Sequence, residues 1–131
     1  MPEDIFKYKI GSPDEAAMLV MEDLRYLKQE CLLTILLNAQ NGVIKIITNT
    51  IGGLNSNIIE LREIFKDPIR YSASKIIIAH NHPSGNPYPS ETDIEFTKRV
   101  YEAGKIFGIE LVDHLVIGNG VFASLKKMNK F

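Results

Sequence analysis

Hydrophobic and polar residues follow two periods along this chain, one typical of helices and one typical of strands. Three stretches carry apolar residues at helical spacing, and each begins with a residue that can cap a helix. The predicted helices run from Ser12 to about Lys28, from Asn57 to about Tyr71, and from Ser90 to about Phe107. Pro68 lies inside the second stretch and is expected to end or kink that helix.

Short apolar runs between these helices predict strands. The run from Glu30 to Asn38 is nearly continuous, which is typical of a strand buried on both faces. The predicted strands cover residues 30–38, 43–48, 75–80, 109–117 and 121–124, with turns at Asn41-Gly42 and Gly118-Asn119-Gly120. Residues 1–11 are expected to form an extended lead-in, and 49–56 a polar, glycine-rich loop. This order of elements predicts a mixed, layered α/β fold in a single domain over residues 1–131.

Composition and charge narrow the function classes. The formal net charge of the 131 residues is -1, so a strong, sequence-independent attraction to DNA is not expected. The single cysteine, Cys31, excludes an intrachain disulfide and is interpreted as a small buried hydrophobe in a reducing, cytoplasmic setting. No apolar stretch approaches a membrane span, and the amino terminus lacks the apolar region of a signal peptide, so no membrane association is expected.

The segment from His80 to Asp93 contains the strongest chemical signal. Strand residues two apart point to the same face, so His80 and His82 can grip one ion if the strand persists through His82. Asp93 lies in the first turn of the following helix, and the proline-rich loop can bring it back over the strand end. Two imidazoles and one carboxylate leave the fourth position of a tetrahedral Zn²⁺ ion open, as catalytic zinc sites require.

Each part of this pattern has a simpler interpretation. Two histidines in an HxH arrangement are often an ordinary surface pair, and Asp93 could merely complete a capping box with Ser90. The tripeptide His80-Asn81-His82 does not define an HNH nuclease, whose residues are dispersed over a ββα-metal fold. A zinc deaminase needs a Cys-x-x-Cys pair that the chain does not have. The combination of HxHPxG with SxxD nevertheless favours a zinc site.

Hydrolysis of an amide also needs a group that takes a proton from water and passes it to the leaving amine. Glu30 is a candidate because it opens the first buried strand, an unusual position for a carboxylate without a role. The alternative is a solvated residue at a helix–strand junction, which sequence position alone favours.

The segment HNHPSGNPYPSETD resembles the signature of the RadC family, within the JAMM/MPN metalloprotease superfamily. That superfamily has a glutamate, then H-x-H, then Ser-x-x-Asp, with eleven positions from the second histidine to the aspartate, as from His82 to Asp93 here. Gln29-Glu30 and the segment Asp113-His114-Leu115-Val116-Ile117 also look like RadC features. The resemblance covers most of the chain and implies a JAB/MPN-type, cytidine-deaminase-like sheet flanked by helices.

The resemblance implies roles for individual residues. His80, His82 and Asp93 would bind Zn²⁺, Glu30 would be the general acid/base, and Ser90 would help stabilise the oxyanion of a tetrahedral intermediate. The family's Pro-Arg-Glu motif is only partly matched, because Leu61 precedes Arg62-Glu63. Many members also have an amino-terminal helical domain that resembles helix-hairpin-helix modules and for which this chain has no room, so the chain is expected to be either a naturally short protein or a fragment.

Three functions are therefore compared. The first is a zinc-dependent metallopeptidase or isopeptidase that hydrolyses a peptide or isopeptide bond. The second is an accessory protein of DNA repair or recombination in which zinc is structural or vestigial, and the third is a scaffold like the metal-free MPN domains. The intact ligand set argues against the scaffold.

Asp113 and His114 are expected to be structural, with a partly buried histidine held by hydrogen bonds. The apolar strands are also compatible with a homodimer.

Overall fold

A computed structural model describes residues 8–51 and 60–131, apart from the side chains of residues 50 and 51. The helices of this described part are α1 (Pro13–Leu24), α2 (Leu61–Arg70) and α3 (Glu91–Phe107). The strands are β1 (Cys31–Leu37), β2 (Val43–Ile51), β3 (Lys75–Asn81), β4 (Glu110–Ile117) and β5 (Phe122–Ser124). The predicted mixed α/β class is confirmed. Within the described residues, no helix has the length and apolar character needed to cross a membrane.

The strands form one mixed sheet in the order β2-β1-β3-β4-β5. Only β3 and β4 are parallel, and α3 connects them, as a parallel crossover requires. The antiparallel register of β1 and β3 pairs Leu32 with His80. The carboxyl end of β3, which carries the histidines, therefore lies beside the start of β1.

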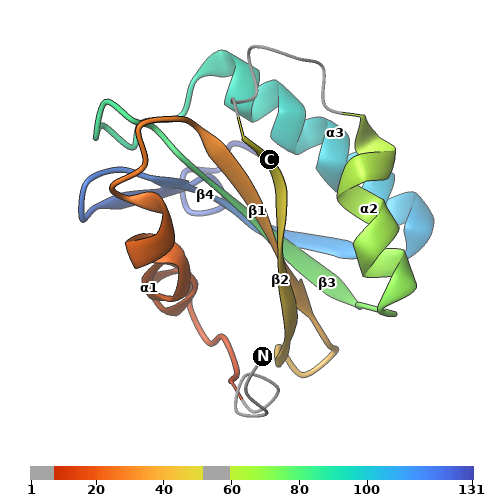
Figure 1. Cartoon of the computed structure of the whole chain (residues 1–131). Helices are drawn as coiled ribbons and strands as arrows, with labels where there is room; N and C mark the ends of the chain where they lie inside the picture. The colour runs from red at the N-terminus through yellow and green to blue at the C-terminus, as the bar shows by residue number, and fades with distance from the viewer. Residues whose placement is uncertain (1–7, 52–59) are drawn as a thin grey trace.

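Helices cover both faces of the sheet, with α1 on one face and the pair α2 and α3 on the other (Figure 1). Alternate strand residues separate accordingly. Ile77 and Ala79 of β3 belong to the core under α1, whereas Ile76 and Ile78 belong to the core under α2 and α3. His80 continues the second series, so its side chain lies on the face of α3. Every residue of β1 is buried, as the continuous apolar run predicts.

The limits of α3 are confirmed by its caps. Ser90 is the N-cap, and Gly108 ends the helix in the left-handed conformation at a φ of 71°. The prediction for the first helix is wrong at its end, because α1 stops at Leu24 rather than near Lys28. Beyond it, Leu27 is 41% exposed, and the carbonyl groups of Leu27 and Gln29 accept hydrogen bonds from the Asn81 side chain instead of from a further helical turn.

Two further boundaries differ from the prediction. The second strand does not end at Thr48, because the backbone of β2 stays paired with β1 until Ile51 lies opposite Cys31. Pro68 does not end α2, which continues to Arg70. The predicted helix start at Asn57, the end of the predicted 49–56 loop and the first part of the predicted lead-in lie outside the described residues. The described residues 8–10 run extended beside residues 41–43, with Ile10 N–H donating to Asn41 C=O at 2.9 Å.

Candidate metal centre

The two predicted histidine ligands leave the end of β3 on the same face of the sheet. His80 is in the strand, and His82 follows Asn81, the last strand residue. The backbone N–H of His82 still donates to the Ile117 carbonyl of β4 at 2.9 Å, so the extended geometry continues past the formal end of β3. The expectation that both imidazoles project to one side is therefore met, with ring centroids 4.9 Å apart.

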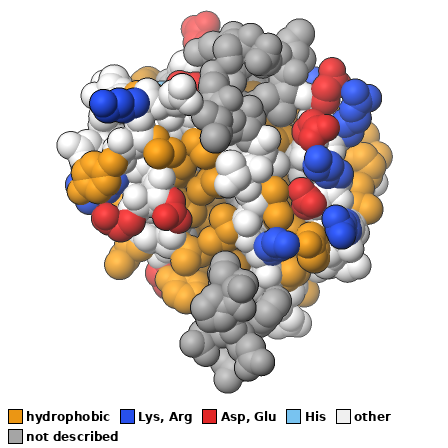
Figure 2. Space-filling view, viewed as in Figure 1, with side chains coloured by type: hydrophobic (Ala, Val, Ile, Leu, Met, Phe, Trp, Pro, Cys, Tyr) orange, Lys and Arg blue, Asp and Glu red, His pale blue; other side chains and the backbone are white. Residues whose placement is uncertain are grey.

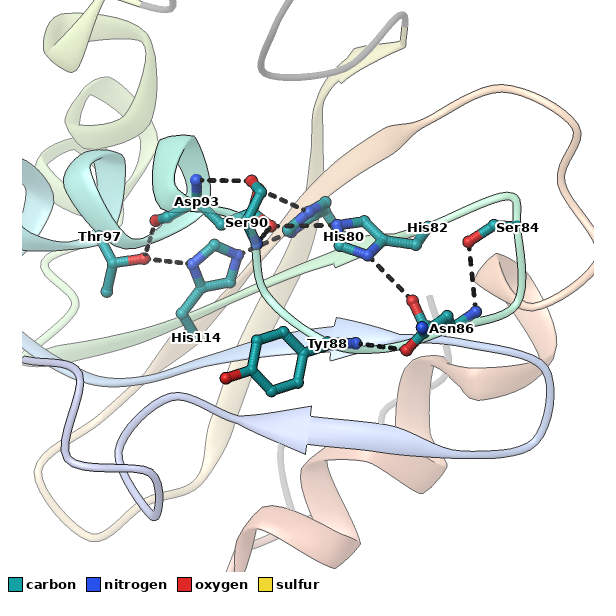
Figure 3. A network of polar contacts seen from close by, with 9 residues as sticks. All are labelled: His80, His82, Ser84, Asn86, Tyr88, Ser90, Asp93, Thr97 and His114. Carbon is teal, nitrogen blue, oxygen red and sulfur yellow. Dashed lines mark hydrogen bonds and ion pairs between the residues drawn. The ribbon is translucent and has the colours of Figure 1, made fainter.

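Asp93 reaches the histidines from the first turn of α3. Its backbone N–H donates to Ser90 Oγ at 3.1 Å, and its Oδ2 accepts from Ser90 N–H at 2.7 Å, so the capping box is real. The same carboxylate also faces both imidazoles, with Oδ1 3.1 Å from His80 Nε2 and Oδ2 3.0 Å from His82 Nε2 (Figure 3). Asp93 therefore forms the capping box and also lies where it could bind a metal ion together with both histidines.

The ligand atoms of these three residues are close enough to hold one metal ion. They all lie within 4.8 Å of one another. Two ligands about 2.1 Å from a tetrahedral zinc are about 3.4 Å apart, close to the distances from Asp93 to both imidazoles. His80 Nε2 is buried, and despite its distance of 3.1 Å from Asp93 Oδ1 it has no partner in hydrogen-bond geometry among the described residues. A buried nitrogen of this kind suits a metal ligand.

Hydrogen bonds fix the outer side of each imidazole. His82 Nδ1 lies 3.0 Å from the Asn86 carbonyl oxygen, which can only accept, so Nδ1 carries a proton and Nε2 is the nitrogen that faces Asp93. His80 Nδ1 lies 2.7 Å from Nε2 of His114, a residue of β4 that is fully buried. The Thr97 hydroxyl contacts His114 Nδ1 and donates to the Asp93 carbonyl at 2.6 Å.

The contact of His114 with His80 goes beyond the sequence prediction. His114 is hydrogen-bonded as expected, but it is completely rather than partly buried and lies directly behind a candidate ligand. Its neighbour Asp113 points to the other face and accepts hydrogen bonds from the backbone of His114 and Lys126, a structural role. Thr97 was missed, although its position four residues after Asp93 places it on the same side of α3.

The charges at the site follow from these contacts. Burial by itself raises the pKa of Asp93, but the two imidazoles and the Ser90 N–H outweigh it and hold that pKa far below its usual range. The hydrogen bond to Asp93 raises the pKa of His82 above its ordinary value, against the effect of burial. Burial lowers the pKa of His114 well below its ordinary value, so this ring is neutral.

Glu30 lies close to this group. The register that pairs Leu32 with His80 places Glu30, two residues earlier on the same face, across from His82. The charge of Glu30 also contributes to the raised pKa of His82. The half-buried Glu30 is therefore on the metal side of the sheet rather than at a fully solvated junction.

Asn81, between the two histidines, points to the opposite face and holds the chain on both sides of Glu30. Its Oδ1 accepts from the Cys31 N–H at 2.7 Å, and its Nδ2 donates to the Gln29 carbonyl at 3.0 Å. Sequence reasoning gave Asn81 no role. Its only sequence signal is a polar residue that follows the apolar Ile77 and Ala79 on the same face of the strand.

Comparisons with known proteins agree with the geometry. A family profile described as "RadC-like JAB domain" matches residues 10–130. The chain belongs to the RadC-like JAB domain family. It is 54% identical over 120 residues to a UPF0758 protein of Clostridium tetani, covering 92% of this chain and 53% of that relative. A UPF0758 protein of Moorella thermoacetica is 52% identical over 120 residues, covering 92% of this chain and 52% of the relative.

The match to the curated relatives covers only part of their length. The chain spans about half the length of these curated relatives, with 53% and 52% of their residues matched. The matched residues of this chain, 10–130, include His80, His82 and Asp93, together with Glu30 and Ser90. Catalytic roles for these residues must therefore be argued from the geometry and chemistry of the site.

Proposed function

We propose that this RadC-like JAB domain is a zinc-dependent metallopeptidase or isopeptidase that hydrolyses an amide bond. The observation that carries the proposal is the convergence of three ligand atoms from His80, His82 and Asp93, with a buried His80 nitrogen aimed among them. When bound, Zn²⁺ would activate a water molecule and polarise the substrate carbonyl. Three protein ligands are typical of catalytic rather than structural zinc sites.

Glu30 is the proposed general acid/base. It is not one of the three ligands, and its charge acts on His82, which is the position that a general acid/base beside the metal needs. It would accept a proton from the attacking water at a carboxylate oxygen. It would then deliver that proton to the amine nitrogen as the carbon–nitrogen bond breaks.

Ser90 is the proposed oxyanion donor. Its side chain is exposed and its Oγ accepts from the Asp93 N–H, which leaves the hydroxyl hydrogen available to a substrate oxygen. A donor fixed at a helix N-cap needs little rearrangement during the reaction, which is the condition for effective oxyanion stabilisation. Ser90 is therefore expected to lower the barrier rather than to bind the metal.

The proposed substrate is a peptide or an isopeptide, and direct DNA binding is not part of the proposal. Lys and Arg side chains alternate with Asp and Glu on the side of the molecule formed by α2 (Figure 2). One such pair, Lys66 and Glu63, is 3.0 Å apart. Interspersed charges and a net charge of -1 do not form the basic stripe expected of a nucleic-acid surface. A steep salt dependence of DNA affinity would contradict this inference.

The decisive experiment combines zinc analysis with hydrolysis of a panel of peptide and isopeptide substrates. Wild type is expected to hold one zinc ion, and His80→Ala to lose it. Glu30→Gln should retain zinc but lose turnover by about 10²- to 10⁴-fold, the usual contribution of general acid–base catalysis. Glu102→Gln, on the exposed side of α3, is the matched control and should behave like wild type.

The outcomes separate the parts of the proposal. Full activity of Glu30→Gln would remove Glu30 from the mechanism but leave the metal site intact. A wild-type protein that cannot be loaded with zinc would refute the proposed function as a whole.

A further inference from the structure

Behind the three ligands lies a buried chain of hydrogen bonds that the proposed chemistry does not use. It runs from the Asp93 carbonyl through Thr97 Oγ1 to His114 Nδ1, and from His114 Nε2 to His80 Nδ1 (Figure 3). Thr97, His114 and His80 are all buried. We propose that Thr97 and His114 are positioning residues that select the metal-binding tautomer of His80.

The direction in which each hydrogen bond of this series is donated follows from counting the available hydrogens. Thr97 has one hydroxyl hydrogen, and it points to the Asp93 carbonyl oxygen, which can only accept. Thr97 Oγ1 must then accept from His114 Nδ1–H, and a second proton on Nε2 would place an unpaired charge on a fully buried ring. His114 Nε2 is left as an acceptor, and His80 donates to it from Nδ1. The lone pair of His80 is thereby placed on Nε2, the atom that faces Asp93 and His82.

The reverse direction is disfavoured by the same geometry. If Thr97 donated to His114, the ring would donate from Nε2 to His80 Nδ1, and His80 would carry its proton on Nε2. Thr97 Oγ1 would then lie 2.6 Å from the Asp93 carbonyl oxygen with no hydrogen between the two oxygens. The reversed direction would thus leave two acceptors in contact, whereas the forward direction gives the carbonyl its donor and leaves a lone pair on His80 Nε2 where a cation can use it.

This inference depends on the metal site of the proposed function, but not on hydrolysis. A His80 ring with its proton on Nε2 cannot bind a cation through that atom until the proton moves. Thr97, although it touches no ligand side chain, is therefore expected to set part of the zinc affinity. Residues that orient a ligating histidine from behind typically change metal affinity by about 10- to 100-fold when removed.

The test replaces Thr97 with valine, which has nearly the same shape but no hydroxyl, and with serine, which keeps the hydroxyl. Zinc affinity of the full chain is measured by competition with a chromophoric chelator. Thr97→Val should bind zinc about 10- to 100-fold more weakly than wild type, and Thr97→Ser should retain wild-type affinity. Recovery by serine distinguishes the hydrogen-bond role from a simple packing role.

A second readout needs neither metal nor substrate. The chain has three histidines, so long-range proton–nitrogen NMR spectra of the zinc-free protein can resolve each imidazole. Wild type should show His80 and His114 protonated on Nδ1, and Thr97→Val should show both protonated on Nε2.

The inference is wrong if the wild-type rings already carry their protons on Nε2, or if Thr97→Val matches wild type in zinc affinity. A wild type that binds zinc without hydrolysing any substrate would refute the proposed function and leave this inference standing. A wild type that binds no zinc would refute the metal site, and the tautomers would still decide whether the chain of hydrogen bonds runs as argued.

Discussion

Replacement of Asn81 by leucine tests how strongly the site depends on a residue that binds no metal. The Asn81 side chain is 1% exposed and joins the end of β3 to the segment that carries Glu30. Leucine has a similar size but neither the amide oxygen nor the amide hydrogens. The substitution therefore removes the hydrogen bonds to Cys31 and Gln29, and the longer one of 3.5 Å to the exposed Leu27, without opening a large cavity.

The expected loss can be estimated from the partners. The Cys31 N–H is buried and would be left without its acceptor, which costs about 1–3 kcal/mol. The Gln29 carbonyl belongs to an exposed residue and can turn to water, so its loss is about 0.5–1.5 kcal/mol. The sum of about 1.5–4.5 kcal/mol is a large part of the about 5–15 kcal/mol that stabilises a typical domain. It corresponds to a fall in Tm of about 6–18 °C for a chain of this size.

The assay is urea unfolding of the zinc-free protein together with amide hydrogen exchange. Asn81→Leu should unfold at lower urea with an unchanged m-value, and the Cys31 amide should lose its protection. Asn119→Ala is the matched control, because that exposed side chain accepts one hydrogen bond, from Arg25 at 3.1 Å, and should change little. A free energy of unfolding within about 0.5 kcal/mol of wild type, the usual range for surface changes, would refute the reasoning.

Two further predictions concern the loop and the charges. A Cβ at Gly118 would lie 2.3 Å from the Gly85 carbonyl oxygen, so Gly118→Ala should displace the loop that holds His82. Zinc binding, measured by competition with a chelator, should then be weaker. The control Gly108→Ala adds a Cβ with no neighbour within 4 Å and should lower stability only. In the zinc-free protein, the lowered pKa of Asp93 stabilises the fold above pH 3.8, the pKa of this group in the unfolded chain. The raised pKa of His82 stabilises the fold below pH 6.5, and this stabilisation is lost as pH rises through the pKa of His82 in the folded protein. The free energy of unfolding of wild type minus that of Asp93→Asn, measured against pH, should therefore be greatest between pH 3.8 and 6.5, the ordinary values of the two groups.

The sequence was a good guide where local chemistry decides the structure. The limits of α3 follow from the capping preferences of Ser90, Asp93 and Gly108. The continuous apolar run of β1 indicated burial on both faces. The HxH spacing placed two imidazoles on one side of β3 because strand geometry has a period of two.

Features that depend on contacts between distant residues could not be predicted in this way. The end of α1 at Leu24 depends on Asn81, more than 50 residues further along the chain, which takes up the Leu27 and Gln29 carbonyls. The position of Glu30 across from His82 depends on the register of β1 and β3, which the apolar pattern leaves open. A buried histidine at 114 was expected, but its contact with His80 requires the parallel pairing of β3 and β4.

The arrangement explains why a site at the ends of strands can be rigid. His80 is supported from behind by His114, and His82 by the Asn86 carbonyl, while the capping box fixes Asp93. Each support comes from a different element, so no single loop movement can release all three ligands. The helix N-terminus would by itself repel a cation, but the Asp93 carboxylate that caps it reverses the local charge. The proposed metal binding and the start of α3 therefore depend on the same side chain, and a change at Asp93 is expected to affect both.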